Sequence, residues 1–199
     1  MKQLFTFIIV ISLFPAQAQK INKKLQQQLE VMTAGFKGDV GIYVKDLHTG
    51  KVASIHADSI FPTASMVKVP ILIGIIDKIN KGELSYHQEL TYKDSLFYAG
   101  SDLLASLKNN EKVELSKVMM LMLTTSDNTA SLWLQSLAGT GTRINQILDS
   151  IGYTATRVNS RTPGREANRE QFGWGQTSPR EMVTFFEQLA NRTLLDAAS

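Results

Sequence analysis

Apolar residues recur at helical spacing in several stretches of the chain, and each such stretch predicts a helix. Over 65–81 they stand three or four positions apart, and Gly82 follows the last turn. The same pattern predicts further helices over 21–34, 115–123, 129–138 and 144–151. The 115–123 stretch is nearly all apolar, which is typical of a helix buried on most sides.

The last helix has a sequence signal at its start. In Ser178-Pro179-Arg180-Glu181, serine suits the N-cap, proline suits the first helical position, and the glutamate completes a capping box. The apolar positions that follow predict its inner face: Met182, Phe185, Phe186 and Leu189.

Two stretches near the beginning of the chain predict strands. Residues 39–46 are rich in Val, Ile and Tyr, and 51–56 read as the returning strand after a turn at 48–50. A hairpin followed by many helices predicts an α/β protein with α+β layering. We find no internal repeat and no linker, so the predicted domain is single.

The first residues have the pattern of a secretory signal peptide. Lys2 precedes an apolar run over 4–14, Pro15 ends the run, and Ala16-Gln17-Ala18 supplies small residues around a cleavage site. The run is about half the ~20 residues that a membrane-spanning helix needs. We therefore expect a leader over 1–18, a mature domain over 19–199 without a membrane anchor, and a secreted or periplasmic location.

Composition excludes several kinds of chemistry. The chain has no cysteine, so disulfides and thiol nucleophiles are excluded. The net charge of +3 is not gathered into one block, so we expect no nucleic-acid partner. His48, His56 and His87 are scattered and have no metal-ligand spacing, so we expect no metal and no cofactor.

The first candidate for chemistry is Ser65-Met66-Val67-Lys68. A serine and a lysine three apart at a helix start share one face, so the amine can reach the hydroxyl. Serine needs such help because its hydroxyl is a weak nucleophile. A Ser-x-x-Lys also arises by chance, but this one follows an extended 61–64 segment at the mouth of an apolar helix.

The second candidate is Ser126-Asp127-Asn128, which interrupts two predicted helices. All three residue types cap helices well, so an ordinary N-cap explains the motif on its own. A functional reading gives a second hydroxyl for proton transfer and a side-chain amide that could bind a substrate carbonyl. Both readings can hold together.

The two motifs in this order resemble class A β-lactamases and penicillin-binding proteins. The resemblance runs from about residue 39 to the end of the chain. It implies that Ser65 is the acylated nucleophile, that Lys68 activates it, and that Ser126 relays a proton to the leaving nitrogen. It also implies that Asn128 binds the substrate amide and that the Ser65 N–H forms half of the oxyanion hole.

The chain departs from the family where a deacylating glutamate is expected. Both the spacing from the second motif and the spacing back from Pro179 arrive at Thr162, which is not an acid. The nearest acids are Glu166 and Glu170, on a loop that looks shortened. Two alternatives stay open: Glu166 is the base, or both acids pair with neighbouring arginines on a solvated loop.

A second departure is the absence of a Lys-Thr-Gly motif after the last predicted helix. In the family this strand supplies the second oxyanion donor, whose loss costs roughly 2.7–4 kcal/mol of transition-state stabilisation. His48-Thr49-Gly50 mimics the motif but precedes the nucleophile. We therefore expect a fold that is C-terminally truncated relative to the family.

The sequence favours a serine β-lactamase that acts through an acyl-enzyme, with a small β-lactam as its partner. One alternative is a D-Ala-D-Ala peptidase or penicillin-binding relative acting on peptidoglycan peptides. Another is a non-catalytic domain that binds wall fragments. We expect a monomer. Trp174 stands between two glycines and either lines the substrate cleft or only packs its loop.

Overall fold

The computed structural model describes residues 19–100 and 102–194; the predicted leader over 1–18 lies outside the described residues. The helices are α1 (Lys23–Thr33), α2 (Lys68–Asn80), α3 (Leu115–Thr124), α4 (Asn128–Leu137), α5 (Thr140–Ser150), α6 (Glu166–Phe172) and α7 (Pro179–Ala190). The strands are β1 (Ile42–Lys45), β2 (Val52–Ile55), β3 (Phe61–Pro62), β4 (Glu89–Thr91), β5 (Lys112–Glu114), β6 (Arg157–Val158) and β7 (Gly175–Thr177). Short 3-10 helices include η1 (Ala64–Val67), which leads into α2.

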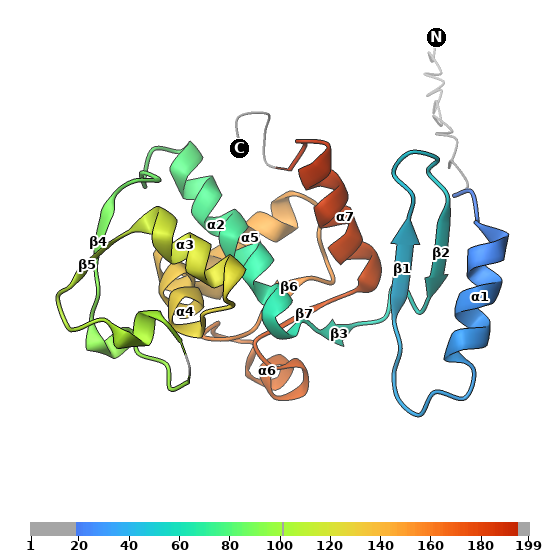
Figure 1. Cartoon of the computed structure of the whole chain (residues 1–199), viewed down its shortest axis with the longest axis horizontal. Helices are drawn as coiled ribbons and strands as arrows, with labels where there is room; N and C mark the ends of the chain where they lie inside the picture. The colour runs from blue at the N-terminus through green and yellow to red at the C-terminus, as the bar shows by residue number, and fades with distance from the viewer. Residues whose placement is uncertain (1–18, 101, 195–199) are drawn as a thin grey trace, which may run out of the picture.

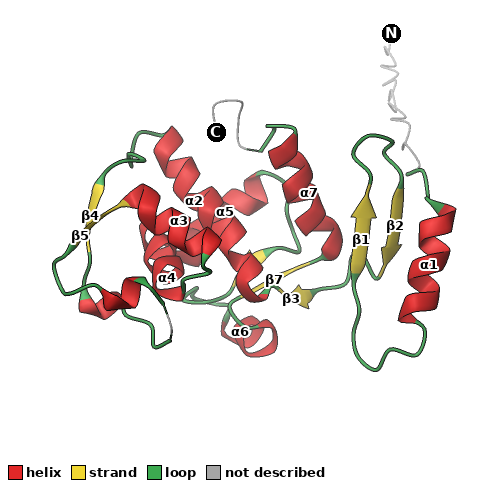
Figure 2. Ribbon diagram, viewed as in Figure 1, coloured by secondary structure: helices red, strands yellow, loops and turns green. Residues whose placement is uncertain are grey.

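The described chain has a helical body with a β-hairpin at one side (Figure 1). The body gathers α2, α3, α4 and α5, whereas β1 and β2 pair antiparallel between α1 and α7. Figure 2 shows how little of the chain is strand. β3, β7 and β6 form a small antiparallel sheet beneath the body, and β4 pairs with β5 at its far edge. Within the described residues, no helix is long and apolar enough to cross a membrane.

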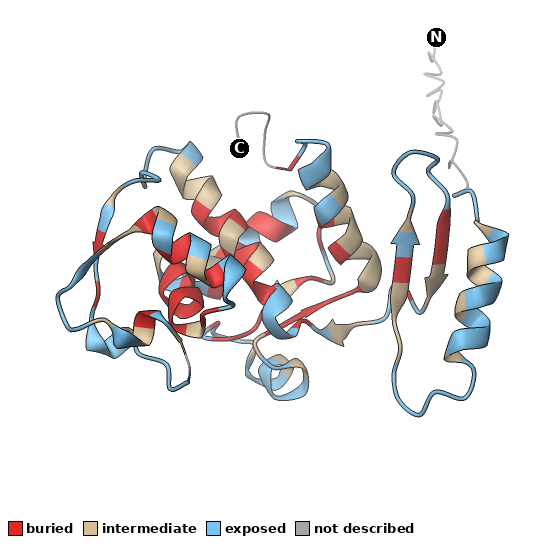
Figure 3. Cartoon of the chain, viewed as in Figure 1, coloured by how far each residue is buried: buried red, intermediate tan, exposed pale blue. Residues whose placement is uncertain are grey.

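The core is built around α2, as the burial pattern in Figure 3 shows. Ile71 and Ile75 are fully buried, in one cluster with side chains from α3, α4, α5 and α7. Each such apolar side chain contributes about 1.5–3 kcal/mol by leaving water. Gly74 allows the close crossing, because a Cβ there would stand 2.9 Å from both Ala138 and Ile144. This packing fixes α2, which begins at Lys68 directly after the η1 turn that carries Ser65.

Buried side-chain amides attach the small sheet to the body. Asn145 of α5 donates to the Val158 carbonyl and accepts from the Val158 N–H, both at 2.9 Å. Gln135 of α4 exchanges two hydrogen bonds with Ser160, at 2.5 and 2.9 Å. These side-chain amides make hydrogen bonds of the kind that the backbone of a neighbouring strand would otherwise provide. They hold the 158–160 segment, from which the α6 loop begins.

The α7 start differs in part from the predicted capping box. Ser178 accepts from the Glu181 N–H at 3.2 Å, as a cap should. The Glu181 carboxylate, however, does not return to the cap. It accepts instead from the backbone N–H groups of residues 154–156 at 2.6 to 2.9 Å. Glu181 makes these tertiary hydrogen bonds in place of the capping bond because they satisfy three backbone donors rather than one.

Other predictions were wrong in detail. Met182 and Phe185 are buried, but Phe186 and Leu189 are 53% and 44% exposed because no described element covers that side of α7. The helix predicted to begin at residue 65 starts instead as the 3-10 turn η1. The loop predicted to carry Glu166 and Glu170 instead contains the short helix α6. The fold class, with a hairpin followed by many helices, is confirmed.

Candidate active site

Ser65 lies at the point where the small sheet passes into the central helix. β3 leads through Ala64, whose φ of 46° is rare for a residue with a side chain, into η1 and then α2. The Ser65 side chain is exposed, whereas Lys68 is only 4% exposed. The lysine Nζ lies 3.3 Å from Ser65 Oγ, so the predicted shared face is confirmed.

Lys68 Nζ is held by a ring of oxygen atoms. It donates to the Ser126 carbonyl at 2.6 Å, to Ser126 Oγ at 2.7 Å and to Asn128 Oδ1 at 3.0 Å. Among the described residues, no carboxylate lies within ion-pair distance of this amine. Neutral acceptors stabilise an ammonium less than a carboxylate would, which leaves the amine able to give up its proton.

Ser126 occupies a strained corner between α3 and α4. Its φ of 59° is in the left-handed region that glycine favours. In this conformation the carbonyl and the hydroxyl of one residue both reach Lys68. Ser126 Oγ also lies 2.8 Å from Ser65 Oγ, so the two hydroxyls and the amine form a closed triangle. Such strain is typical of functional sites.

The electrostatics of Lys68 follow from its burial. Desolvation lowers the pKa of the lysine below its ordinary value, and the negative charges of Asp102 and Asp127 oppose that shift. The net direction is downward, which favours a neutral amine. A neutral amine beside a serine hydroxyl is the arrangement that general-base catalysis requires.

Two carboxylates hold the start of α4. Asp127 is the N-cap, and its side chain accepts from the Ala130 N–H at 2.7 Å and from the Leu104 N–H at 2.9 Å. Asp102 accepts from the Thr129 N–H at 2.8 Å and from the Thr129 hydroxyl at 3.1 Å. The predicted capping role is therefore confirmed for Asp127. The caps fix Asn128, the first residue of α4, beside Lys68.

A cavity of about 450 Å³ opens above these groups. Ser65, Lys68 and Asn128 belong to its lining, which also includes three aromatic residues: Tyr98, Phe172 and Trp174. Trp174 lines this cavity and also packs against the buried core cluster. Tyr98 and Phe172 were missed because they lie in polar stretches without helical or strand periodicity. Within the described chain, no group of three His, Cys, Asp or Glu residues is placed to hold a metal ion.

The acidic candidates lie elsewhere. Glu166 lines a separate hollow of about 370 Å³ together with Arg161, Thr162 and Arg169, and it accepts from the Gly164 N–H at 3.1 Å. Neither Glu166 nor Glu170 forms an ion pair among the described residues. Neither lines the Ser65 cavity. The helical turn of α6 instead brings Gln171 and Phe172 to that cavity.

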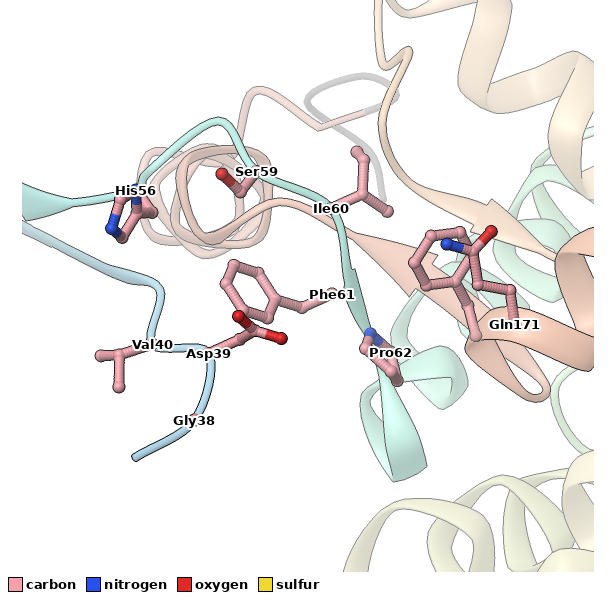
Figure 4. A pocket seen from close by; sticks show the side chains of 10 residues that line it. Gly38, Asp39, Val40, His56, Ser59, Ile60, Phe61, Pro62 and Gln171 are labelled. Carbon is pink, nitrogen blue, oxygen red and sulfur yellow. The ribbon is translucent and has the colours of Figure 1, made fainter. Parts of the chain in front are cut away.

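A neighbouring hollow of about 530 Å³ adjoins the Ser65 cavity (Figure 4). The two share Pro62, Gln171 and Phe172. Its far end is formed by 38–40 and by residues His56, Ser59 and Phe61. β3 borders this hollow through Phe61 and Pro62 before the chain reaches Ser65.

Comparison with known proteins agrees with this geometry. A family model described as "Beta-lactamase enzyme family" matches residues 23–199. Beta-lactamase VEB-1 of Pseudomonas aeruginosa is 23% identical over 177 residues, which cover 84% of this chain and 58% of that protein. The structure of PBP-A is similar with a TM-score of 0.78 and 26% identity, and the match covers 89% of this chain and 65% of the other. A beta-lactamase from Chitinophaga pinensis has the same fold, with a TM-score of 0.75 at 20% identity.

The fold is thus of the β-lactamase and transpeptidase type, as the two serine motifs implied. The chain belongs to the beta-lactamase enzyme family. It spans 58% and 63% of the length of two curated relatives, VEB-1 and AER-1 of Aeromonas hydrophila.

Proposed function

We propose that this protein is an exported serine hydrolase that opens the amide of a β-lactam through an acyl-enzyme on Ser65. The observation that carries the proposal is the triangle of Ser65 Oγ, Lys68 Nζ and Ser126 Oγ, with edges of 3.3, 2.7 and 2.8 Å. Membership of the family supports the β-lactam as the substrate class. The leader-like sequence of residues 1–18 supports export.

The geometry suggests how the first step proceeds. The neutral Lys68 amine takes the Ser65 proton while Oγ attacks the lactam carbonyl carbon. The Ser65 N–H stabilises the developing oxyanion, and the Asn128 side-chain N–H groups are available for a substrate carbonyl. When the C–N bond breaks, the proton passes from Lys68 through the Ser126 hydroxyl to the leaving nitrogen. The lysine returns to the neutral state, and the acyl group stays on Ser65.

The second candidate is a penicillin-binding relative, and one observation favours it. Among the residues that the structure describes, no carboxylate lines the Ser65 cavity, and none is placed to activate water against the acyl-enzyme. Such a site acylates and then releases its product slowly. A mutant of PBP-A, whose fold is similar, is described as an acyl-enzyme complex with penicillin G.

A chromogenic cephalosporin distinguishes the candidates when it is incubated with the full-length gene product. Continuous turnover supports a β-lactamase, and a single stoichiometric burst supports the penicillin-binding alternative. Intact-protein mass provides the second measurement, since either function predicts a mass increase after a penicillin. Ser65→Ala should abolish that increase, whereas the exposed Ser85→Ala should keep it. The absence of an adduct on the native protein would overturn the proposal and support a non-catalytic binding domain.

A further inference from the structure

Two aromatic rings from separate loops meet at the Ser65 cavity. Tyr98 lies in the segment before Asp102, and Trp174 lies between α6 and β7. Their ring centroids are 5.1 Å apart and their planes are 85° apart, which is an edge-to-face pair. Trp174 also packs against the core cluster, whereas Tyr98 is 38% exposed, so the pair is anchored on one side and accessible on the other. Both residues line the cavity that holds the reactive serine.

Both rings are attached to rigid parts of the molecule. The Tyr98 N–H donates to the Thr129 hydroxyl at 3.2 Å, and that fully buried residue is itself held by Asp102. The Trp174 carbonyl accepts from the Asn159 and Ser160 N–H groups at 2.8 and 3.0 Å. Backbone anchors of this kind lower the entropy lost when a ligand packs against a ring.

The cavity is chemically divided. Its reactive end carries Ser65, Lys68 and Asn128, and Trp174 with Phe172 supplies an apolar aromatic surface. In the described part of the chain, no acidic side chain lines the cavity, and the one cation in its lining is the buried Lys68 that contacts the serine. An acyl donor with its carbonyl at Ser65 would therefore place its side chain near an aromatic surface with no charged group to bind.

We infer that Trp174, paired with Tyr98, is a specificity-determining residue that selects acyl donors whose side chain ends in an aromatic ring. The inference rests on the proposed function, because the donor is the compound that Ser65 attacks. An aromatic side chain gains both the burial of apolar area and a favourable ring–ring geometry.

The test compares two penicillins that share one ring system. Benzylpenicillin carries a phenylacetyl side chain, and the penicillin nucleus carries a bare amine. We expect the native protein to be acylated by benzylpenicillin about tenfold faster, measured as the second-order rate constant by intact mass. Trp174→Leu should reduce that preference about fivefold while the rate with the bare nucleus changes less than about twofold. Trp174→Phe should keep most of the preference.

The control is Phe97→Leu, which removes a half-exposed ring next to Tyr98 in the chain that does not line the cavity. It should leave the preference unchanged. An equal loss with both compounds, or an unchanged preference in Trp174→Leu, would overturn the inference while the proposed function stands. If neither compound acylates the native protein, the proposed function fails and the inference with it. Thermal unfolding of each variant identifies those that do not fold.

Discussion

At the scale of single residues, the decisive feature is a buried lysine that forms no ion pair with any carboxylate of the described residues. Lys68 is 4% exposed, and within the described part of the chain its Nζ lies at hydrogen-bonding distance from oxygens of Ser65, Ser126 and Asn128. Burial of an unpaired ammonium is costly, and the cost falls when the amine is neutral. The lowered pKa of Lys68 therefore favours the neutral amine, which can act as a base beside Ser65.

Replacing Lys68 by methionine should slow acylation by at least about 100-fold, because the Ser65 proton then has no acceptor. Methionine has a similar length and no charge, so the fold should tolerate it. The measurement is the acylation rate from intact mass. Lys81→Met, on the surface in an ion pair with Asp77, is the matched control and should leave the rate unchanged. A fall of less than about fivefold would exclude Lys68 as the activator.

The pH dependence of acylation should follow the same amine. Since burial lowers the pKa of Lys68, the rate should rise with pH as the amine deprotonates and level off below the ordinary lysine value of about 10.4. Stopped-flow acylation across a pH series measures the midpoint. A midpoint at or above that value would mean that the lysine is not the base.

At the scale of elements, the start of α4 and the segment before it hold each other through two carboxylates. Asp127 reaches from α4 to the Leu104 N–H, and Asp102 reaches back to Thr129. The exchange is reciprocal, so neither element can shift without breaking a charged hydrogen bond. It positions Asn128 beside Lys68, and through Thr129 it positions Tyr98.

Asp102→Ala should lower the free energy of unfolding by about 1 kcal/mol, the usual value of a helix cap. It should also move the midpoint of the acylation pH profile to lower pH, because the Asp102 charge opposes the downward shift of the Lys68 pKa. Asp94→Ala removes an equal charge without a cap on α4 and serves as the control. A loss of stability with an unmoved midpoint would assign Asp102 a structural role alone.

The hydrogen bonds of Glu181 predict that the stability of the fold depends on pH. Burial raises the pKa of this carboxyl, but hydrogen bonds from Ala155, Thr156 and Thr154 outweigh burial and lower it overall. A lowered folded pKa contributes stability above the unfolded value of about 4.3, and that contribution is lost as pH falls through the folded pKa.

Glu181→Gln should therefore cost about 1–3 kcal/mol near neutral pH, from the loss of charged hydrogen bonds. The difference between the native protein and the variant should shrink below about pH 4.3. Urea unfolding at several pH values measures it. Glu187→Gln, on the same helix in a partly exposed ion pair with Lys45, should cost less. A difference that does not change with pH would contradict the assignment.

At the scale of the whole molecule, the hairpin docks on the helical body through a narrow region. β1 packs on α7, and Arg180 lies 4.7 Å from the centre of the Tyr43 ring while it pairs with Asp58. The Phe61 ring and Pro179 come so close to the backbone of Gly41 that a Cβ there would overlap both. Glycine at this position therefore sets how closely the hairpin approaches.

Gly41→Ala should destabilise the protein by about 1–3 kcal/mol, because the added methyl group displaces Phe61 or separates the hairpin from α7. Gly100→Ala is the control, since its Cβ would meet nothing nearer than the Asp102 carboxylate at 4.0 Å. Thermal or urea unfolding gives both values. Equal effects in the two variants would mean that the cost comes from the loss of glycine itself rather than from the contact.

The sequence by itself determined the local elements and the motif that carries the chemistry. Helical periodicity predicted α2 to within a turn, because Ile71 and Ile75 must face one side to be buried. Three-residue spacing placed Lys68 over Ser65 because a helix repeats about every 3.6 residues. These features depend on residues close together in the chain, so a pattern is enough to find them.

Tertiary structure decided the features that join distant residues. Three contacts link segments far apart in the chain: Ser65 with Ser126, Tyr98 with Trp174, and the Glu181 carboxylate with the backbone of residues 154–156. It also decided that Glu166 faces a different hollow from Ser65. No local pattern encodes such contacts, because they arise only when burial of the α2 core brings the segments together.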